Sequence, residues 1–171
     1  MKGVRKTLWS LFIASTFLAS QGLFASISFG KKATILLFVA SRCPCTDPHR
    51  LLIQSLVKEY QNKGVRFYAI FSNREETKEL ASRFMQQTGW NFPWLIDHDG
   101  KMKEKFDAKV TPEAFLIDER GKIAYRGAID DSIFNLGRIE KPYLKTALLQ
   151  LLDGKKTFPS SATPYGCIIV R

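Results

Sequence analysis

The sequence predicts an α/β protein with one mixed central sheet and helices on both faces. Strand-like and helix-like segments alternate first, and a hairpin and one more helix follow. Helical crossovers favour parallel pairing in the first half, whereas the hairpin is antiparallel. The chain has 171 residues, of which 45% are hydrophobic and 25% charged. These values are typical of one soluble globular domain and exclude collagen-like, largely disordered and multi-pass membrane chains.

Residues 1–25 have the pattern of a secretory signal peptide. A basic start over residues 1–6 precedes an apolar run over 8–19, and Ala25 ends a stretch typical of a cleavage site. Cleavage there leaves a domain of residues 26–171, periplasmic or secreted. The alternative is an uncleaved membrane anchor, because residues 7–30 carry no charge. In both cases the domain lies outside the cytoplasm, where disulfides can form.

The charge of the chain does not indicate a nucleic-acid partner. Lys and Arg number 26 against 16 Asp and Glu, for a formal net charge of +10. The basic residues are spread along the chain with acids between them, and the densest run, residues 101–105, reads as a solvated helix face. Any use of the excess charge is better assigned to an anionic membrane surface.

The first half of the domain begins with strand 33–40, whose continuous apolar run is typical of a buried central strand. A helix should begin at Asp47, as the cap, with Pro48 in its first turn, and end at Gly64. Its apolar stripe comprises Leu52, Ile53, Leu56, Val57 and Tyr60. Residues 65–71 are the next strand.

Asn73 is expected to cap a second helix, whose apolar face carries Leu80, Ala81, Phe84 and Met85. The rest of the domain comprises a short strand over 92–97, a short helix over 101–108, a hairpin of strands 114–118 and 123–126, a final helix over 142–152, and a tail over 158–171.

Two cysteines follow the first strand at the mouth of the first helix. A helix N-terminus presents unpaired N–H groups and a partial positive charge, so Cys43 and Cys45 are placed for thiolate chemistry. His49 lies close by and is a candidate proton shuttle. The alternative for His49 is a histidine on the helix surface beside the loop.

At these residues the chain resembles the thioredoxin-like redoxins, the superfamily of thiol-disulfide oxidoreductases and peroxiredoxins. The resemblance covers about residues 30–171 and implies a thioredoxin-like fold. It rests on the strand-Cys-helix start, on the motif over 92–97, on Val110-Thr111-Pro112-Glu113-Ala114-Phe115, and on the hairpin ending Tyr125-Arg126-Gly127. The ending Thr163-Pro164-Tyr165-Gly166-Cys167 resembles a peroxiredoxin-like bacterial subgroup that closes with a Gly-Cys motif.

The resemblance implies that Thr111-Pro112 is the family's cis-proline. A cis bond there would hold the loop against the redox cysteines, and the preceding backbone would pair with an extended substrate segment. Thr111 and Pro112 are therefore candidate substrate-binding residues. The alternative is an ordinary trans proline that enters a strand.

The chain also departs from the patterns of its relatives. Only Pro44 separates Cys43 from Cys45, so a disulfide between them would be strained and easily reduced. Ala40 stands where peroxiredoxins place their peroxide-binding hydroxyl, although Ser41 and Thr46 are near enough to act as substitutes. Leu37 occupies the position at which thioredoxins keep a buried acid.

Cys167 is the third cysteine and lies in the tail. We expect the tail to fold back so that Cys167 approaches the Cys43 loop, as a resolving or structural partner of Cys43 or Cys45. A bridge that closes so long a loop could contribute about 4 kcal/mol. The alternative is a buried, unpaired cysteine in an apolar segment.

The sequence therefore predicts an exported thiol-disulfide oxidoreductase. Cys43 attacks a substrate disulfide to form a mixed disulfide, and Cys45 or Cys167 resolves this mixed disulfide. The expected partners are protein thiols and disulfides with an electron donor or acceptor; no organic cofactor and no metal is implied. The first alternative is a peroxiredoxin-like thiol peroxidase with antioxidant activity. Less favoured are a noncatalytic binding module and a copper protein, because copper-handling relatives separate their two cysteines by three residues and add a distant histidine. The remaining histidine, His98, reads as a turn residue.

Overall fold

The computed structural model describes residues 27–132 and 138–171. The predicted signal peptide and the alternative anchor, both within residues 1–30, lie almost wholly outside these ranges. Within the two ranges, none of the helices has the length and apolar character needed to cross a membrane.

The sheet has six strands and is mixed, as predicted. Its order is β3-β2-β1-β5-β6-β7. β1 pairs in parallel with β2 and antiparallel with β5; β2 pairs in parallel with β3, β5 antiparallel with β6, and β6 in parallel with β7. The bounds are Ala33–Val39 for β1, Val65–Phe71 for β2, Trp94–Ile96 for β3, Glu113–Asp118 for β5, Ile123–Gly127 for β6 and Ser161–Ala162 for β7.

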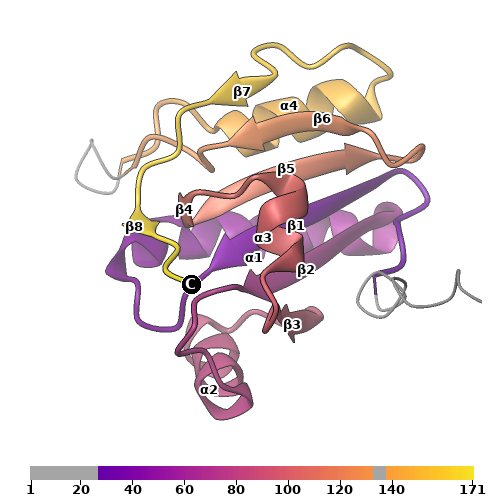
Figure 1. Cartoon of the computed structure of the whole chain (residues 1–171). Coiled ribbons are helices and arrows are strands. Elements are labelled where there is room, and N and C mark those ends of the chain that lie inside the picture. The colour runs from indigo at the N-terminus through magenta and orange to yellow at the C-terminus, as the bar shows by residue number, and fades with distance from the viewer. Residues whose placement is uncertain (1–26, 133–137) are drawn as a thin grey trace, which may run out of the picture.

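Both faces of the sheet are covered, which confirms the prediction of helices on both faces (Figure 1). Successive side chains of a strand point to opposite faces, so β1 divides its residues between two core clusters. Ile35, Leu37 and Val39 join the larger cluster with α1 (Arg50–Tyr60), α2 (Lys78–Thr88) and α4 (Tyr143–Leu152). Leu36 and Phe38 join the smaller cluster with α3 (Lys101–Phe106).

The two predicted helix starts are wrong in position. The chain enters a 3-10 helix, η2 (Pro44–His49), before α1 begins, since Pro48 has no N–H and interrupts the α-helical ladder. α2 is capped by Thr77, whose hydroxyl accepts from Leu80 N, and not by Asn73. After α1, a 3-10 turn, η3 (Gln61–Lys63), ends at Gly64 with φ +93°, as expected of a glycine stop.

The tail contributes two short strands that were not predicted. β8 (Cys167–Ile168) pairs antiparallel with β4 (Val110–Thr111), and β7 extends the main sheet. Figure 1 shows β8 beside β4, with the end of the tail close to the carboxyl end of β1. This brings the tail to the place where the cysteine loop leaves the sheet.

Candidate active site

The loop after β1 places Cys43 at the entrance of η2. Cys43 is the residue that caps this 3-10 helix, and its N–H donates to Ala40 O at 3.2 Å. Its side chain is 7% exposed, whereas Cys45 is half-buried. The predicted position at a strand end and helix mouth is therefore correct, although the helix that follows is of the 3-10 type.

The Thr111-Pro112 bond is cis and lies beside Cys43, as predicted. The Cys43 thiol donates to the carbonyl oxygen of Thr111, with Sγ and O 3.0 Å apart. Thr111 is 1% exposed. The loop between β4 and β5 therefore packs directly against the sulfur.

The tail does fold back, and Cys167 reaches the same point. Cys167 lies opposite Thr111 in the β4–β8 pair, and the Sγ atoms of the three cysteines lie within 4.8 Å of one another. All three are free thiols. Gly166 permits this approach, because a Cβ there would lie 2.0 Å from Thr111 O.

Contacts beyond Cys167 fix the position of the tail. Ile169 N donates to Lys109 O at 3.0 Å, and the Ile169 side chain is 5% exposed in the core cluster on the α3 side. Val170 N donates to Asn73 Oδ1 at 2.8 Å. The guanidinium of Arg171 donates to three backbone carbonyls, those of Ser72, Asp97 and His98.

The expectation of an open backbone at Thr111 and Pro112 is not met. The tail already occupies the strand position beside Thr111, through the pairing with Cys167. A substrate chain could pair there only after the tail moves, since a strand edge binds one neighbour at a time. Pro112 still lines a neighbouring pocket.

The three thiols differ in acidity. Burial acts to raise the pKa of Cys43, but hydrogen bonds that Cys167, Thr111 and the backbone offer to its thiolate outweigh burial and lower that pKa below its usual value. Burial raises the pKa of Cys167 to about 12, and the nearby Cys43 thiolate adds to this effect. Burial, together with the charge on Cys43, also raises the pKa of Cys45. The first proton therefore leaves Cys43.

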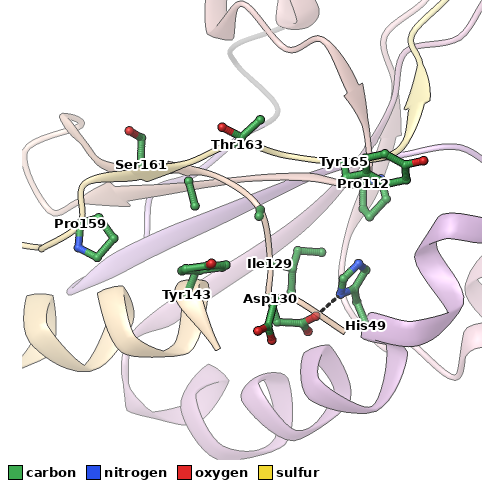
Figure 2. A pocket seen from close by; sticks show the side chains of 12 residues that line it. His49, Pro112, Ile129, Asp130, Tyr143, Pro159, Ser161, Thr163 and Tyr165 are labelled. Carbon is green, nitrogen blue, oxygen red and sulfur yellow. Dashed lines mark hydrogen bonds and ion pairs between the residues drawn. The ribbon is translucent and has the colours of Figure 1, made fainter. Parts of the chain in front are cut away.

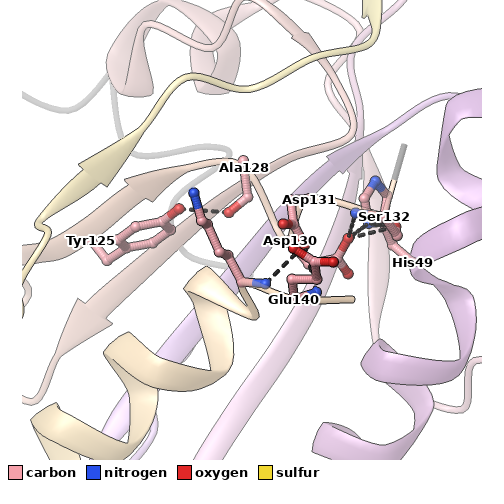
Figure 3. A network of polar contacts seen from close by, with 8 residues as sticks. His49, Tyr125, Ala128, Asp130, Asp131, Ser132 and Glu140 are labelled. Atoms are coloured by element: carbon pink, nitrogen blue, oxygen red, sulfur yellow. Dashed lines mark hydrogen bonds and ion pairs between the residues drawn. The ribbon is translucent and has the colours of Figure 1, made fainter. Parts of the chain in front are cut away.

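His49 is not a surface histidine, which excludes that alternative. It is 3% exposed, and its Nδ1 lies 2.7 Å from Oδ1 of Asp130, which also accepts from Ser132 N at 2.8 Å. Figure 3 shows this buried network between η2 and the segment that follows β6. No local sequence pattern marks this network, because Asp130 is 81 residues from His49.

His49 also lines a pocket of about 360 Å³ with Pro112, Tyr143 and Tyr165. Figure 2 shows the imidazole between Asp130 on one side and Pro112 and Tyr165 on the other. Ile129 and Asp130 also line this pocket. Because Thr111 contacts Cys43 and Pro112 faces His49, the cis bond connects the thiol cluster with the histidine pocket.

Glu76 is a site residue that the sequence analysis missed. Its Oε1 accepts from Ser41 N at 2.9 Å, the side chain is 3% exposed, and Oε2 has no partner among the described residues. Burial raises the pKa of Glu76. The buried acid that Leu37 does not supply is thus brought to the cysteine loop from a segment 35 residues away.

Two hydroxyls of the loop are also buried without a hydrogen-bond partner among the described residues. They are Ser41 Oγ and Thr46 Oγ1, the two candidate substitutes for the peroxide-binding hydroxyl. Thr46 N donates to Cys43 O at 3.4 Å, so Thr46 lies one turn of η2 after the cysteine.

The comparisons with known proteins bear on the family and the fold. The model of the Redoxin family matches residues 19–138. A crystal structure of an uncharacterized conserved protein from Geobacillus kaustophilus has 30% identity and a TM-score of 0.76, covering 83% of this chain and 78% of that one. A thioredoxin-like protein solved in its oxidised form has 16% identity and a TM-score of 0.60, covering 74% and 82%. The predicted thioredoxin-like fold is confirmed.

Among curated proteins, the thiol-disulfide oxidoreductase ResA of Bacillus subtilis is 30% identical over 93 residues. The match covers 54% of this chain and 50% of that protein, so the chain spans about half the length of the curated relatives it matches. The resemblance to a peroxiredoxin-like subgroup with a Gly-Cys ending remains a prediction.

Proposed function

The chain belongs to the Redoxin family, and we propose that it is a thiol-disulfide oxidoreductase in which Cys43 attacks and Cys167 resolves. The observation that carries the proposal is the meeting of three free thiols, of which Cys43 alone has a lowered pKa. A thiolate is the nucleophile in disulfide exchange, so the order of the pKa values assigns the first step to Cys43.

In the first step the Cys43 thiolate attacks one sulfur of a substrate disulfide. A mixed disulfide forms, and the other substrate sulfur leaves as a thiolate that takes up a proton. Cys167 then loses its proton and attacks the Cys43 sulfur. The Cys43–Cys167 disulfide forms, and the second substrate thiol is released. Two electrons pass from the protein to the substrate, and a thiol electron donor restores the dithiol form; the same steps run in reverse for oxidation.

The coupling between the two thiols supports this order. The Cys43 thiolate contributes to the raised pKa of Cys167. When Cys43 enters a mixed disulfide it loses its charge, so this contribution disappears and Cys167 becomes easier to deprotonate. Cys45 is the alternative resolving thiol, but its ring with Cys43 would span only Pro44.

His49 is assigned to the proton that the leaving thiolate takes up. Asp130 holds Nδ1, which fixes the ring, while the ring also faces the pocket lined by Pro112. In a test, His49→Gln keeps a polar side chain at this position. The rate of exchange should fall and change its dependence on pH, whereas a purely structural role would lower the stability without changing the pH profile.

The principal test is thiol trapping with single Cys→Ser variants. Cys43→Ser should lower the rate of exchange with a protein disulfide at least about 100-fold, since a serine hydroxyl is not ionised at neutral pH. Cys167→Ser should accumulate the mixed disulfide at Cys43, visible by mass spectrometry, and Cys45→Ser should not. Accumulation in Cys45→Ser instead would make Cys45 the resolving thiol, and full activity of Cys43→Ser would contradict the proposal.

A peroxidase activity is the second candidate, favoured by the unpaired hydroxyls of Ser41 and Thr46 and by the tail that covers Thr111. A peroxide is a small molecule, so its reaction with Cys43 does not require pairing with the strand edge at Thr111. Cys43 would displace hydroxide from the peroxide to give a sulfenic acid, which Cys167 would convert into a disulfide with loss of water. Peroxide consumption on the order of 10⁴ M⁻¹s⁻¹ or faster would place this candidate first.

Export is proposed from the sequence alone. The basic, apolar and small-residue order of residues 1–25 supports cleavage after Ala25, which leaves residues 26–171 as the exported domain. N-terminal sequencing of the exported protein should begin at Ser26. A chain that begins at Met1 and stays in the membrane fraction at high salt would favour the anchor.

A further inference from the structure

We propose that the reduced protein binds one Cu(I) ion through the sulfurs of Cys43, Cys45 and Cys167. The three sulfurs, from the loop after β1 and from β8, lie within 4.8 Å of one another. Three thiolates around one ion, each about 2.3 Å from it, lie about 4.0 Å apart in a trigonal plane. The cluster therefore needs to contract by less than about 1 Å per pair of sulfurs.

The donor set selects the ion. Among the described residues, the cluster of metal-type ligands consists of these three sulfurs, and neither histidine belongs to it. His49 is held by Asp130, and Glu76 by Ser41 N. Soft thiolates select Cu(I) and Zn²⁺ over hard cations. Structural zinc sites almost always have four protein ligands, so a site of three sulfurs fits Cu(I) better.

The three ligands are held in place before the ion arrives. The Cys43 loop is continuous with β1 and η2, and the tail is held on both sides of Cys167 by Gly166 against Thr111 and by Ile169 against Lys109. The half-buried sulfurs of Cys45 and Cys167 leave the cluster open to an ion from solvent.

Binding and disulfide formation exclude each other. Each thiol that ligates Cu(I) as a thiolate releases its proton, with no change in oxidation state. Oxidation of Cys43 and Cys167 to a disulfide removes two electrons and two protons, which an added diazene oxidant such as diamide accepts, and leaves only Cys45 as a ligand. The ion should therefore bind the reduced protein and not the oxidised one.

The test is an anaerobic titration of the reduced full chain with Cu(I), in competition with a chromogenic Cu(I) chelator. We expect one ion per chain, and a loss of affinity of at least about 100-fold in each of Cys43→Ser, Cys45→Ser and Cys167→Ser. His98→Ala, which removes an exposed histidine, is the matched control and should bind as the unmodified chain does. An affinity unchanged in any one cysteine variant would overturn the three-sulfur site.

A measurement on the unmodified chain avoids variants that fail to fold. One equivalent of Cu(I) should protect all three cysteines from alkylation, as read by mass spectrometry, and diamide-treated protein should bind none. Protection of only two cysteines, or tighter binding of Zn²⁺ than of Cu(I) in the same competition, would contradict the proposal. Exchange activity is measured without added metal, so failure of the copper site leaves the oxidoreductase proposal standing.

Discussion

The two segments that bring sulfur to the site are held in different ways. The cysteine loop, residues 41–49, is continuous with β1 and α1, and its last residue, His49, forms a buried hydrogen bond with Asp130. The tail, residues 158–171, has only two strands of two residues each. It is held by backbone bonds, by the close fit of Gly166, and by the exposed guanidinium of Arg171 on three carbonyls.

This difference shows how one site can combine a fixed nucleophile with a partner that can be exchanged. A buried pair that loses one member leaves an uncompensated charge, whereas exposed hydrogen bonds can be replaced by water. The loop should therefore be the more costly of the two segments to disturb. The tail can leave Thr111 at a lower cost, which a peptide substrate requires.

The largest expected effect tests the support of the loop. His49→Ala removes one member of a pair in which both side chains are at most 3% exposed, so the free energy of unfolding should fall by about 3 kcal/mol, measured by urea denaturation. His98→Ala, at an exposed position, is the control and should change it by less than about 0.5 kcal/mol. A loss as small as that of the control would mean that the loop is no better held than the tail.

The second prediction compares the sulfurs themselves. The pKa of Cys167 is raised to about 12, whereas that of Cys43 lies below 9.0, so at neutral pH their thiolate fractions differ at least about 1000-fold. The more acidic thiolate is also the weaker nucleophile, which reduces the resulting difference in rate by about 20-fold. Iodoacetamide should therefore alkylate Cys43 at least about 50-fold faster than Cys167, as read by mass spectrometry.

The same experiment on Cys43→Ser sharpens the comparison. Without the Cys43 thiolate, the contribution of its charge to the raised pKa of Cys167 is gone, so Cys167 should be alkylated faster than in the unmodified chain. Equal rates for Cys43 and Cys167 in the unmodified chain would contradict the assignment of the nucleophile.

The third prediction disturbs the tail. Gly166→Ala places a Cβ 2.0 Å from Thr111 O, a backbone atom that cannot rotate away, so the tail must shift. We expect the free energy of unfolding to fall by about 1–2 kcal/mol, and the equilibrium constant for the Cys43–Cys167 disulfide in a glutathione buffer to fall about 10-fold. Gly154→Ala has nothing within 4 Å of its Cβ and should leave the disulfide equilibrium unchanged.

The comparison also explains how much of the fold could be predicted from the sequence. Buried strands such as β1 are continuous apolar runs, and a glycine at positive φ ends η3 after α1. The strand and the helix end can therefore both be predicted from residues that are neighbours in the sequence. The start of α2 was misplaced because Asn73 and Thr77 are both good caps, and a contact with Val170 decides between them. The two strands of the tail are too short to have a periodicity of their own.

In the candidate site, too, features marked by a local sequence pattern could be predicted and those made by distant contacts could not. The cis bond before Pro112 was predicted from a family motif and the approach of Cys167 from the third cysteine in a tail with an apolar end, and the structure has both. The hydrogen bond of His49 with Asp130 and that from Ser41 N to Glu76 join segments 81 and 35 residues apart, respectively. No local pattern marks such partners, because an acidic residue in a loop is usually solvated.

The smallest expected effect concerns the segment that touches both the loop and the tail. Glu76 accepts from Ser41 N in the loop, and Asn73 accepts from Val170 N in the tail. Burial raises the folded-state pKa of Glu76 above its unfolded value, so its contribution to stability is present at pH values below the unfolded pKa and is lost as the pH rises through the folded pKa.

Glu76→Gln cannot ionise, and its Oε1 can still accept from Ser41 N. The stability of the variant relative to the unmodified chain should therefore increase as the pH rises from about 4 to about 8, measured by urea denaturation at each pH. The amide that replaces Oε2 adds a cost that does not vary with pH, so the slope and not the offset is the measured quantity. Glu119→Gln, at an exposed position between β5 and β6, should give a flat difference. A flat or falling difference for Glu76→Gln would show that the carboxylate is solvated in the folded protein and that the loop and the tail are not joined through a buried acid.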